Sequence, residues 1–285
     1  MRPVLDFGCS AFLWGLMFVM SGGYALRSHL IGRARQHRLE SGGEGKLLGR
    51  PLMEAGYWLM QPVVRLLLAI GATPNAVTFG SFAPAAGAAV ALATGHFGVA
   101  AFFAIAAGLC DLLDGVLARQ LGTTSDAGEV LDAAADRVNE FLFLAGLTIH
   151  YRDRPALAVL ALAAMMGSFM ISYSTAKAEA LQVPPPKGFM RRAERTFYLC
   201  TGASLVPLVN SVLPLDWAAN REIAELPMTI PLVIVAVLTN ISAILRFVTI
   251  TRLVRGRSDA TVVAAFSHAD DGHADGSTPR ARAHH

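Results

Sequence analysis

Residues 110–138 read CDLLDGVLARQLGTTSDAGEVLDAAADRV, and they join two strongly apolar segments of the chain. The spacing within this stretch is D-x-x-D-G-x-x-A-R, then eight residues, then G-x-x-x-D-x-x-x-D. Residues three or four apart share one face of a helix, so the carboxylates form two pairs, one on either side of the polar turn at residues 122–125. The carboxylates belong to Asp111, Asp114, Asp132 and Asp136. Two consecutive helices can therefore aim all of them into one space.

Several carboxylates beside a bilayer are costly unless cations neutralise them. Ligands that offer only oxygen favour a hard ion, Mg2+ or Mn2+, and such a group suits two ions in a phosphoryl-transfer site. Gly115 and Gly128 would let phosphates approach the backbone, and Arg119 would bind them with a planar guanidinium. The alternative, a set of solvated acids at helix ends, is disfavoured because ionisable groups seldom lie in membrane segments without a task.

The pattern resembles the signature of the CDP-alcohol phosphatidyltransferase family. These membrane enzymes move a phosphatidyl group from CDP-diacylglycerol to an alcohol and release CMP. The resemblance extends over roughly residues 50–255, since Thr73-Pro74-Asn75 with Thr78 is similar to the start of the family's first membrane helix. It implies that Asp111, Asp114 and Asp132 hold metal ions. It also implies that Asp136 completes the metal site and acts as general base.

The same resemblance implies a pocket for the CDP group. Its residues would be Gly115, Ala118, Arg119 and Gly128. Asn75 and Thr78 could add hydrogen bonds to the diphosphate, although such residues before a helix are as commonly caps.

The composition is that of an integral membrane protein. Of the 285 residues, 54% are hydrophobic and 16% are charged, and the mean hydropathy is +0.47. Soluble domains are more charged and less apolar. The formal net charge is only +3, and we expect no nucleic-acid partner. The cysteines lack metal-ligand spacing and are interpreted as small buried hydrophobes.

The apolar segments predict an all-α fold. Six of them between residues 77 and 250 predict a six-helix transmembrane bundle. Residues 51–70 predict an amphipathic helix on the membrane surface, because Glu54 and Arg65 interrupt the apolar pattern. Residues 5–26 predict an additional membrane helix, with a cleaved signal peptide as the alternative.

We therefore expect three parts in the chain. Residues 1–50 would be an N-terminal hydrophobic helix with a basic linker, and 51–255 the CDP-alcohol phosphatidyltransferase membrane domain. Residues 256–285 gather Gly, Asp, His and Arg, which is typical of a disordered tail.

Basic residues predict the orientation. They concentrate at the loops on the signature's side, and the positive-inside rule makes that side cytoplasmic. Arg152 and Arg154 are the exception on the opposite side. We expect a protein integral to the inner membrane, with its active site facing the cytoplasm.

Two basic clusters predict the acceptor. Lys177 lies at the expected end of a helix, and Arg192 with Arg195 would share a helix face, so together they could clamp an acceptor that carries phosphate. For Lys187 and Arg191, plain membrane anchoring is the favoured interpretation.

The two stretches SYSTAKAE (172–179) and RAER (192–195) are similar to elements of the phosphatidylinositol-phosphate synthases, whose acceptor is inositol phosphate. Thr175 stands where we expect a basic residue in that branch. Phosphatidylglycerophosphate synthase, with glycerol 3-phosphate as acceptor, is the alternative. A membrane prenyltransferase and an ion-coupled transporter are alternatives of other classes. The resemblance also implies a homodimer.

Overall fold

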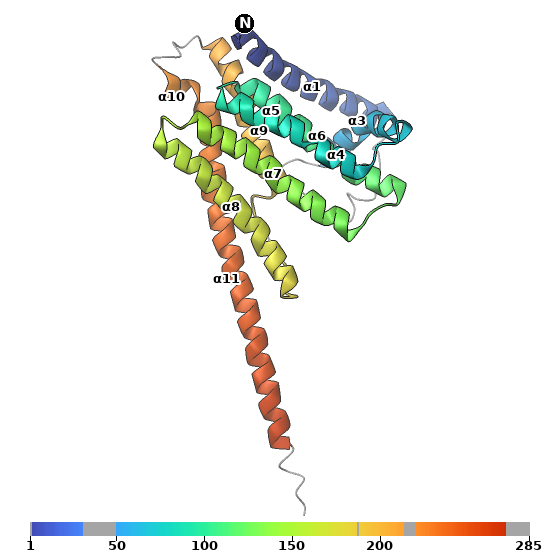
Figure 1. Ribbon diagram of the computed structural model, residues 1–285, viewed down its shortest axis with the longest axis vertical. Helices are drawn as coiled ribbons and strands as arrows, with labels where there is room; N and C mark the ends of the chain where they lie inside the picture. Colours follow the sequence, from blue (N-terminus) through green and yellow to red (C-terminus); the bar gives the residue numbers. More distant parts are fainter. Residues whose placement is uncertain (1, 31–49, 187, 214–219, 272–285) are drawn as a thin grey trace, which may run out of the picture.

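The computed structural model describes residues 2–30, 50–186, 188–213 and 220–271, and all regular structure within them is helical (Figure 1). The predicted all-α fold is confirmed. The helices are α1 (Arg2–Leu30), α3 (Arg50–Ala69), α4 (Pro74–Gly80), α5 (Phe82–Ala93), α6 (Phe97–Leu121), α7 (Asp126–His150), α8 (Pro155–Ala180), α9 (Arg192–Val212), α10 (Arg221–Ala224) and α11 (Leu226–Asp271).

Five segments of the described chain are long and apolar enough to cross a membrane. They lie in α1, in α4 with α5, in α6, in α8 and in α11. Helices α7 and α9 are more polar and pack among them. Six spanning helices after residue 77 therefore stay a prediction, while the helical membrane architecture agrees with the sequence.

Small side chains set how closely the helices approach. Helix α5 packs along α6 and α7, α8 packs along α11, and α9 lies against both α6 and α11. The core between them contains many alanines, and these let the helix backbones come close together. Larger buried side chains fill the remaining space, among them Leu92, Phe97, Leu144, Leu147 and Tyr151.

The turn between α6 and α7 lies where the sequence predicts it. Gly122 ends α6 in the left-handed conformation, with φ of 66°, and the amide of Thr123 donates to the carbonyl of Ala118 at 2.9 Å. Ser125 then caps α7, because its Oγ accepts from the Gly128 amide at 3.1 Å. This short connection brings the last turns of α6 beside the first turns of α7.

Helix α3 is not among the segments that are long and apolar enough to cross a membrane. Its apolar part is short, Met60–Ala69. Met60 and Val64 pack against Leu113 and Val116 of α6, close to the signature. A surface location for α3 agrees with this length and stays a prediction.

Helix α1 packs on the bundle through apolar side chains such as Leu13 and through a polar stripe. The Val99 amide donates to Asp6 Oδ1 at 3.0 Å, and Trp14 Nε1 donates to Ser204 Oγ at 3.2 Å. Ser10 lies between them on the same face, and a Cβ at Gly98 would overlap its hydroxyl. The interpretation of α1 as a retained helix stays a prediction.

The three-part division of the chain stays a prediction. The expected basic linker at 31–49 lies outside the described residues, as do residues 272–285 of the expected tail. Helix α11 itself continues to Asp271, beyond the expected domain boundary (Figure 1).

A buried ionic cluster closes the end of the bundle opposite the signature. Glu225 is fully buried and pairs with Arg154, with His150 Nε2 at 3.1 Å and with Arg221 Nε at 3.1 Å. The guanidinium of Arg154 also lies 4.6 Å from the ring centroid of Tyr151. Burial raises the pKa of Glu225, but the hydrogen bonds from His150 and Arg154 outweigh it and leave the pKa below its usual value. Glu225 thus offsets part of the positive charge of Arg154 and Arg221.

Candidate active site

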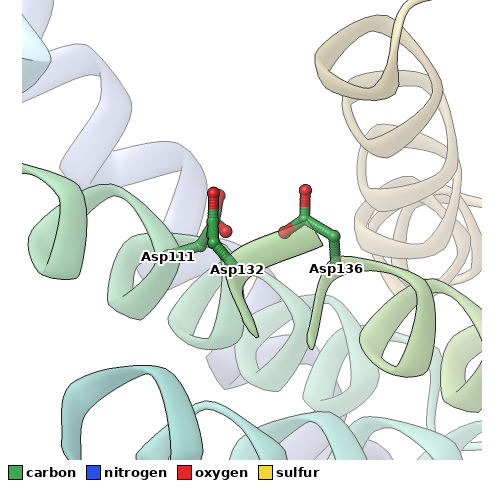
Figure 2. Close-up of side chains that lie close together, drawn as sticks. All are labelled: Asp111, Asp132 and Asp136. Atoms are coloured by element: carbon green, nitrogen blue, oxygen red, sulfur yellow. The ribbon is translucent and has the colours of Figure 1, made fainter. Parts of the chain in front are cut away.

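Three of the four signature aspartates converge at the junction of α6 and α7. Asp111 comes from the last turns of α6, and Asp132 and Asp136 lie one turn apart on α7 (Figure 2). One carboxylate oxygen from each lies within 4.8 Å of the others. The structure therefore brings together residues from both halves of the motif.

Asp114 has different surroundings. Its side chain is buried, and Oδ2 accepts a hydrogen bond of 2.5 Å from Thr78 Oγ1. This bond ties α4 to α6 beside the carboxylate group. A metal-binding role for Asp114 stays a prediction.

The residues at this junction fit divalent metal ions. All the convergent ligands are carboxylates, the donor type that Mg2+ and Mn2+ prefer. Asp132 Oδ1 is buried and has no hydrogen-bond partner among the described residues. Arg192 supplies one positive charge, with NH1 at 2.8 Å from Asp111 Oδ2 and in an ion pair with Asp136. One guanidinium does not balance three carboxylates, so the group favours the binding of further cations.

The residues expected at the CDP group lie around this junction. A Cβ at Gly115 would meet only the side chain of Arg119, at 3.3 Å from NH1, and a Cβ at Gly128 only the Ser125 hydroxyl, at 3.3 Å. Helix packing therefore does not require glycine at either position. Ala118 lies one turn after Asp114 on α6. Asn75 is exposed in the first turn of α4, and its role stays a prediction with the others.

The three residues expected at the acceptor have three different environments. Arg195 is only 2% exposed; its Nε and NH2 donate to Glu140 at 2.7 and 3.0 Å, and NH1 donates to the carbonyl of Met190 at 2.8 Å. Arg192 contacts the aspartates, and Lys177 is exposed in the last turn of α8. Their binding of an acceptor stays a prediction.

Sequence reasoning missed Arg246 on α11. This side chain is 9% exposed, its NH1 donates to Thr175 Oγ1 at 3.2 Å, and its Nε is buried without a hydrogen-bond partner. No carboxylate pairs with it in the described part of the chain, and Ser242 and Gly188 line the cavity beside it. A lone arginine inside an apolar segment was the available signal.

Sequence reasoning also missed Glu140. It lies one turn after Asp136 on α7 and holds Arg195 with both carboxylate oxygens. Its position four residues beyond the motif was visible in the sequence, but its partner was not.

Comparison with known proteins agrees with this geometry. The CDP-alcohol phosphatidyltransferase profile matches residues 71–221. The phosphatidylinositol phosphate synthase of Mycobacterium tuberculosis is 38% identical over 149 residues, which cover 50% of this chain and 68% of that protein.

Solved structures of the Mycobacterium tuberculosis enzyme are also similar. The form with CDP-DAG bound gives a TM-score of 0.56 at 32% identity, covering 66% of this chain and 92% of the other. The complex with manganese and citrate gives a TM-score of 0.57 at 31% identity, covering 66% and 87%.

The chain belongs to the CDP-alcohol phosphatidyltransferase family. It is therefore a membrane-integral transferase of phospholipid biosynthesis, and the interpretation made from the signature is confirmed. The prediction of a divalent-metal cofactor is confirmed as well, because a solved relative binds manganese and a group of three aspartates converges here. The prenyltransferase and transporter alternatives have no support.

Proposed function

We propose that this enzyme transfers the phosphatidyl group of CDP-diacylglycerol to inositol phosphate and releases CMP. The observation that carries the choice of a phosphorylated acceptor is Arg246, a buried arginine without a carboxylate partner among the described residues, near Arg195. An uncompensated buried cation is costly unless an anion binds beside it. The names of the relatives support inositol phosphate in particular.

The aspartates of the signature would hold two divalent ions. Asp111, Asp132 and Asp136 supply the convergent oxygens, and Asp114 lies next to them on α6. Bound ions supply positive charge to the diphosphate and to the leaving CMP. Gly115 and Gly128 would leave room for the nucleotide, with Ala118, Arg119, Asn75 and Thr78 around it.

The acceptor then attacks the phosphatidyl group. Its hydroxyl oxygen forms a bond to the phosphorus that carries diacylglycerol, while the bond from that phosphorus to the CMP oxygen breaks. CMP leaves with the electron pair of that bond. Asp136 accepts the hydroxyl proton as general base, a role that requires it within hydrogen-bond reach of the acceptor.

An acceptor panel tests the proposal. Purified enzyme in liposomes with CDP-diacylglycerol and Mn2+ is given inositol 1-phosphate, free inositol, glycerol 3-phosphate or serine, and CMP and lipid product are measured. We expect turnover with inositol 1-phosphate and little with free inositol. Preference for glycerol 3-phosphate would assign the enzyme as a phosphatidylglycerophosphate synthase, and preference for an unphosphorylated alcohol would refute a phosphate-binding acceptor site.

We also propose that the enzyme lies in the inner membrane with its aspartates facing the cytoplasm. Lys177, Arg191 and Arg252 lie at the aspartate end, whereas two arginines of the far end, Arg154 and Arg221, share Glu225. This distribution of charge supports the orientation. In a cysteine-free background, Thr124→Cys should be shielded from an impermeant maleimide in intact spheroplasts. Asp153→Cys, in the opposite connection, should react.

A homodimer is proposed on the family resemblance. Mass measurement of the enzyme in its lipid-detergent particle, before and after crosslinking in the membrane, tests it. A single-chain mass in both would refute it.

A further inference from the structure

Arg192 occupies the space between the two halves of the aspartate group. Its NH1 lies 2.8 Å from Asp111 Oδ2 on α6 and pairs with Asp136 Oδ1 on α7. Both residues belong to the group whose oxygens lie within 4.8 Å of one another. The NH1 nitrogen of Arg192 therefore binds the same carboxylates that a metal ion shared by α6 and α7 would need.

The side chain of Arg192 is held less firmly than that of Arg195. Arg192 has 31% of its side chain exposed, whereas Arg195 has 3% and grips Glu140 with two nitrogens. Arg192 is also the first residue of α9, so its side chain extends from the end of a helix. It can leave the aspartates without disturbing the core.

We propose that Arg192 is a displaceable counter-charge of the metal site. It offsets part of the negative charge of the aspartates while the site holds no metal, and it leaves when divalent ions bind, because two cations held by the same carboxylate oxygens repel each other at short distance. The released guanidinium then binds the phosphate of the acceptor. This second step rests on the proposed function.

The surroundings of Arg192 support the second step. Arg195 follows one turn later, and its NH1 donates to the carbonyl of Met190. The neighbouring carbonyl of Phe189 accepts from Ser242, on the helix of Arg246. Arg195 is already paired with Glu140, whereas Arg246 is buried and has no carboxylate partner among the described residues. Arg192 therefore moves near a region where Arg246 favours an anion.

Metal titration tests the first step. Mn2+ affinity of the purified full chain is measured by calorimetry or by electron paramagnetic resonance, with no substrate present. Arg192→Gln should bind Mn2+ about ten- to a hundredfold more tightly than the wild type, the factor associated with one hydrogen bond between charged groups. Unchanged or weaker binding would show that Arg192 does not compete with the metal and would overturn the proposal.

Two further variants serve as controls. Arg191→Gln removes the same charge from the adjacent residue, which is exposed and makes no contact with the aspartates in the described structure, so its Mn2+ affinity should stay near wild type. Arg192→Lys keeps the positive charge, so its Mn2+ affinity should also stay near that of the wild type. A change in Arg192→Gln that is absent from Arg192→Lys is then due to the lost charge and not to a disturbed fold. An equal gain in Arg191→Gln would assign the effect to general electrostatics and contradict the direct competition.

A coupling measurement tests the second step. Binding of inositol 1-phosphate and of glycerol 3-phosphate is measured with and without Mn2+. In the wild type, Mn2+ should tighten phosphate binding, and phosphate should tighten Mn2+ binding by the same factor. In Arg192→Gln the coupling should disappear.

The outcomes separate this step from the proposed function. Coupling that survives in Arg192→Gln would mean that the metal holds the phosphate directly, which overturns the transfer of Arg192 to the acceptor. If neither phosphate binds the wild type, the phosphorylated acceptor of the proposed function and the second step are overturned together. The Mn2+ titration decides the first step in every case.

Discussion

The buried pair of Arg195 and Glu140 allows the stability of the enzyme to be tested at one contact. Arg195 is 2% exposed and makes two hydrogen bonds to Glu140 and one to the carbonyl of Met190. Removing one member of a buried ion pair leaves an uncompensated charge, which costs about 3–5 kcal/mol. We therefore expect Glu140→Gln to lower the free energy of unfolding by about that amount.

Thermal unfolding in detergent measures the effect. A loss of about 3–5 kcal/mol should lower Tm by roughly 10 °C for a protein of this size. The double variant Glu140→Gln/Arg195→Gln leaves no charge at this contact and should lose less than the sum of the single variants. Lys177→Gln is the matched control, because it removes one charge from an exposed side chain and should leave Tm unchanged.

The result also decides what Arg195 does. If Arg195→Gln keeps the wild-type Tm and only raises the KM of the acceptor, the arginine binds substrate and the structural reasoning is refuted. If Glu140→Gln and Arg195→Gln both lose stability to a similar extent, the pair fixes α9 to α7.

Three further predictions follow from other contacts. Asp132→Asn should abolish both Mn2+ binding and CMP release. Asp136→Asn should retain CDP-diacylglycerol binding and lose transfer. If Asp136→Asn loses CDP-diacylglycerol affinity and transfer rate equally, that residue acts chiefly as a metal ligand. The pKa of Glu225 is lowered, so the stability that this carboxylate contributes is present above its ordinary pKa of 4.5 and is lost as the pH falls through the folded-state value. In a series of Tm measurements at falling pH, Glu225→Gln should therefore be less sensitive to acid than the wild type. Asp6→Ala should lower the free energy of unfolding by about 0.5–2 kcal/mol, as for other helix caps, and an unchanged Tm would show that its bond to the Val99 amide contributes nothing.

The sequence was sufficient for the parts of the site that depend on local periodicity. Asp132 and Asp136 share a face because they lie four residues apart on one helix, and Gly122 with Ser125 marks the turn that returns the chain. The metal group follows from those local rules and from the chemistry of carboxylates.

The partners of these residues depend on packing between distant segments. Asp111 meets Arg192 across 81 residues of chain, and Asp114 meets Thr78 across 36. No periodic pattern specifies such pairs, so Arg192 and Arg195 looked equivalent in the sequence although one contacts the aspartates and the other Glu140. Arg246 was passed over because its neighbours in the sequence are apolar.

The bond between Asp6 and the Val99 amide extends the folding unit beyond the segment that carries the family's sequence. His96, at the N-terminus of α6, makes no side-chain capping bond of its own, and the carboxylate that serves this helix end comes from α1, 93 residues away. The family match begins only at residue 71. Trimming the chain to that match would keep every signature aspartate and yet deprive α6, which carries Asp111, of a bond at its first turn. The smallest active fragment of this enzyme is therefore expected to be longer than the segment that matches the family.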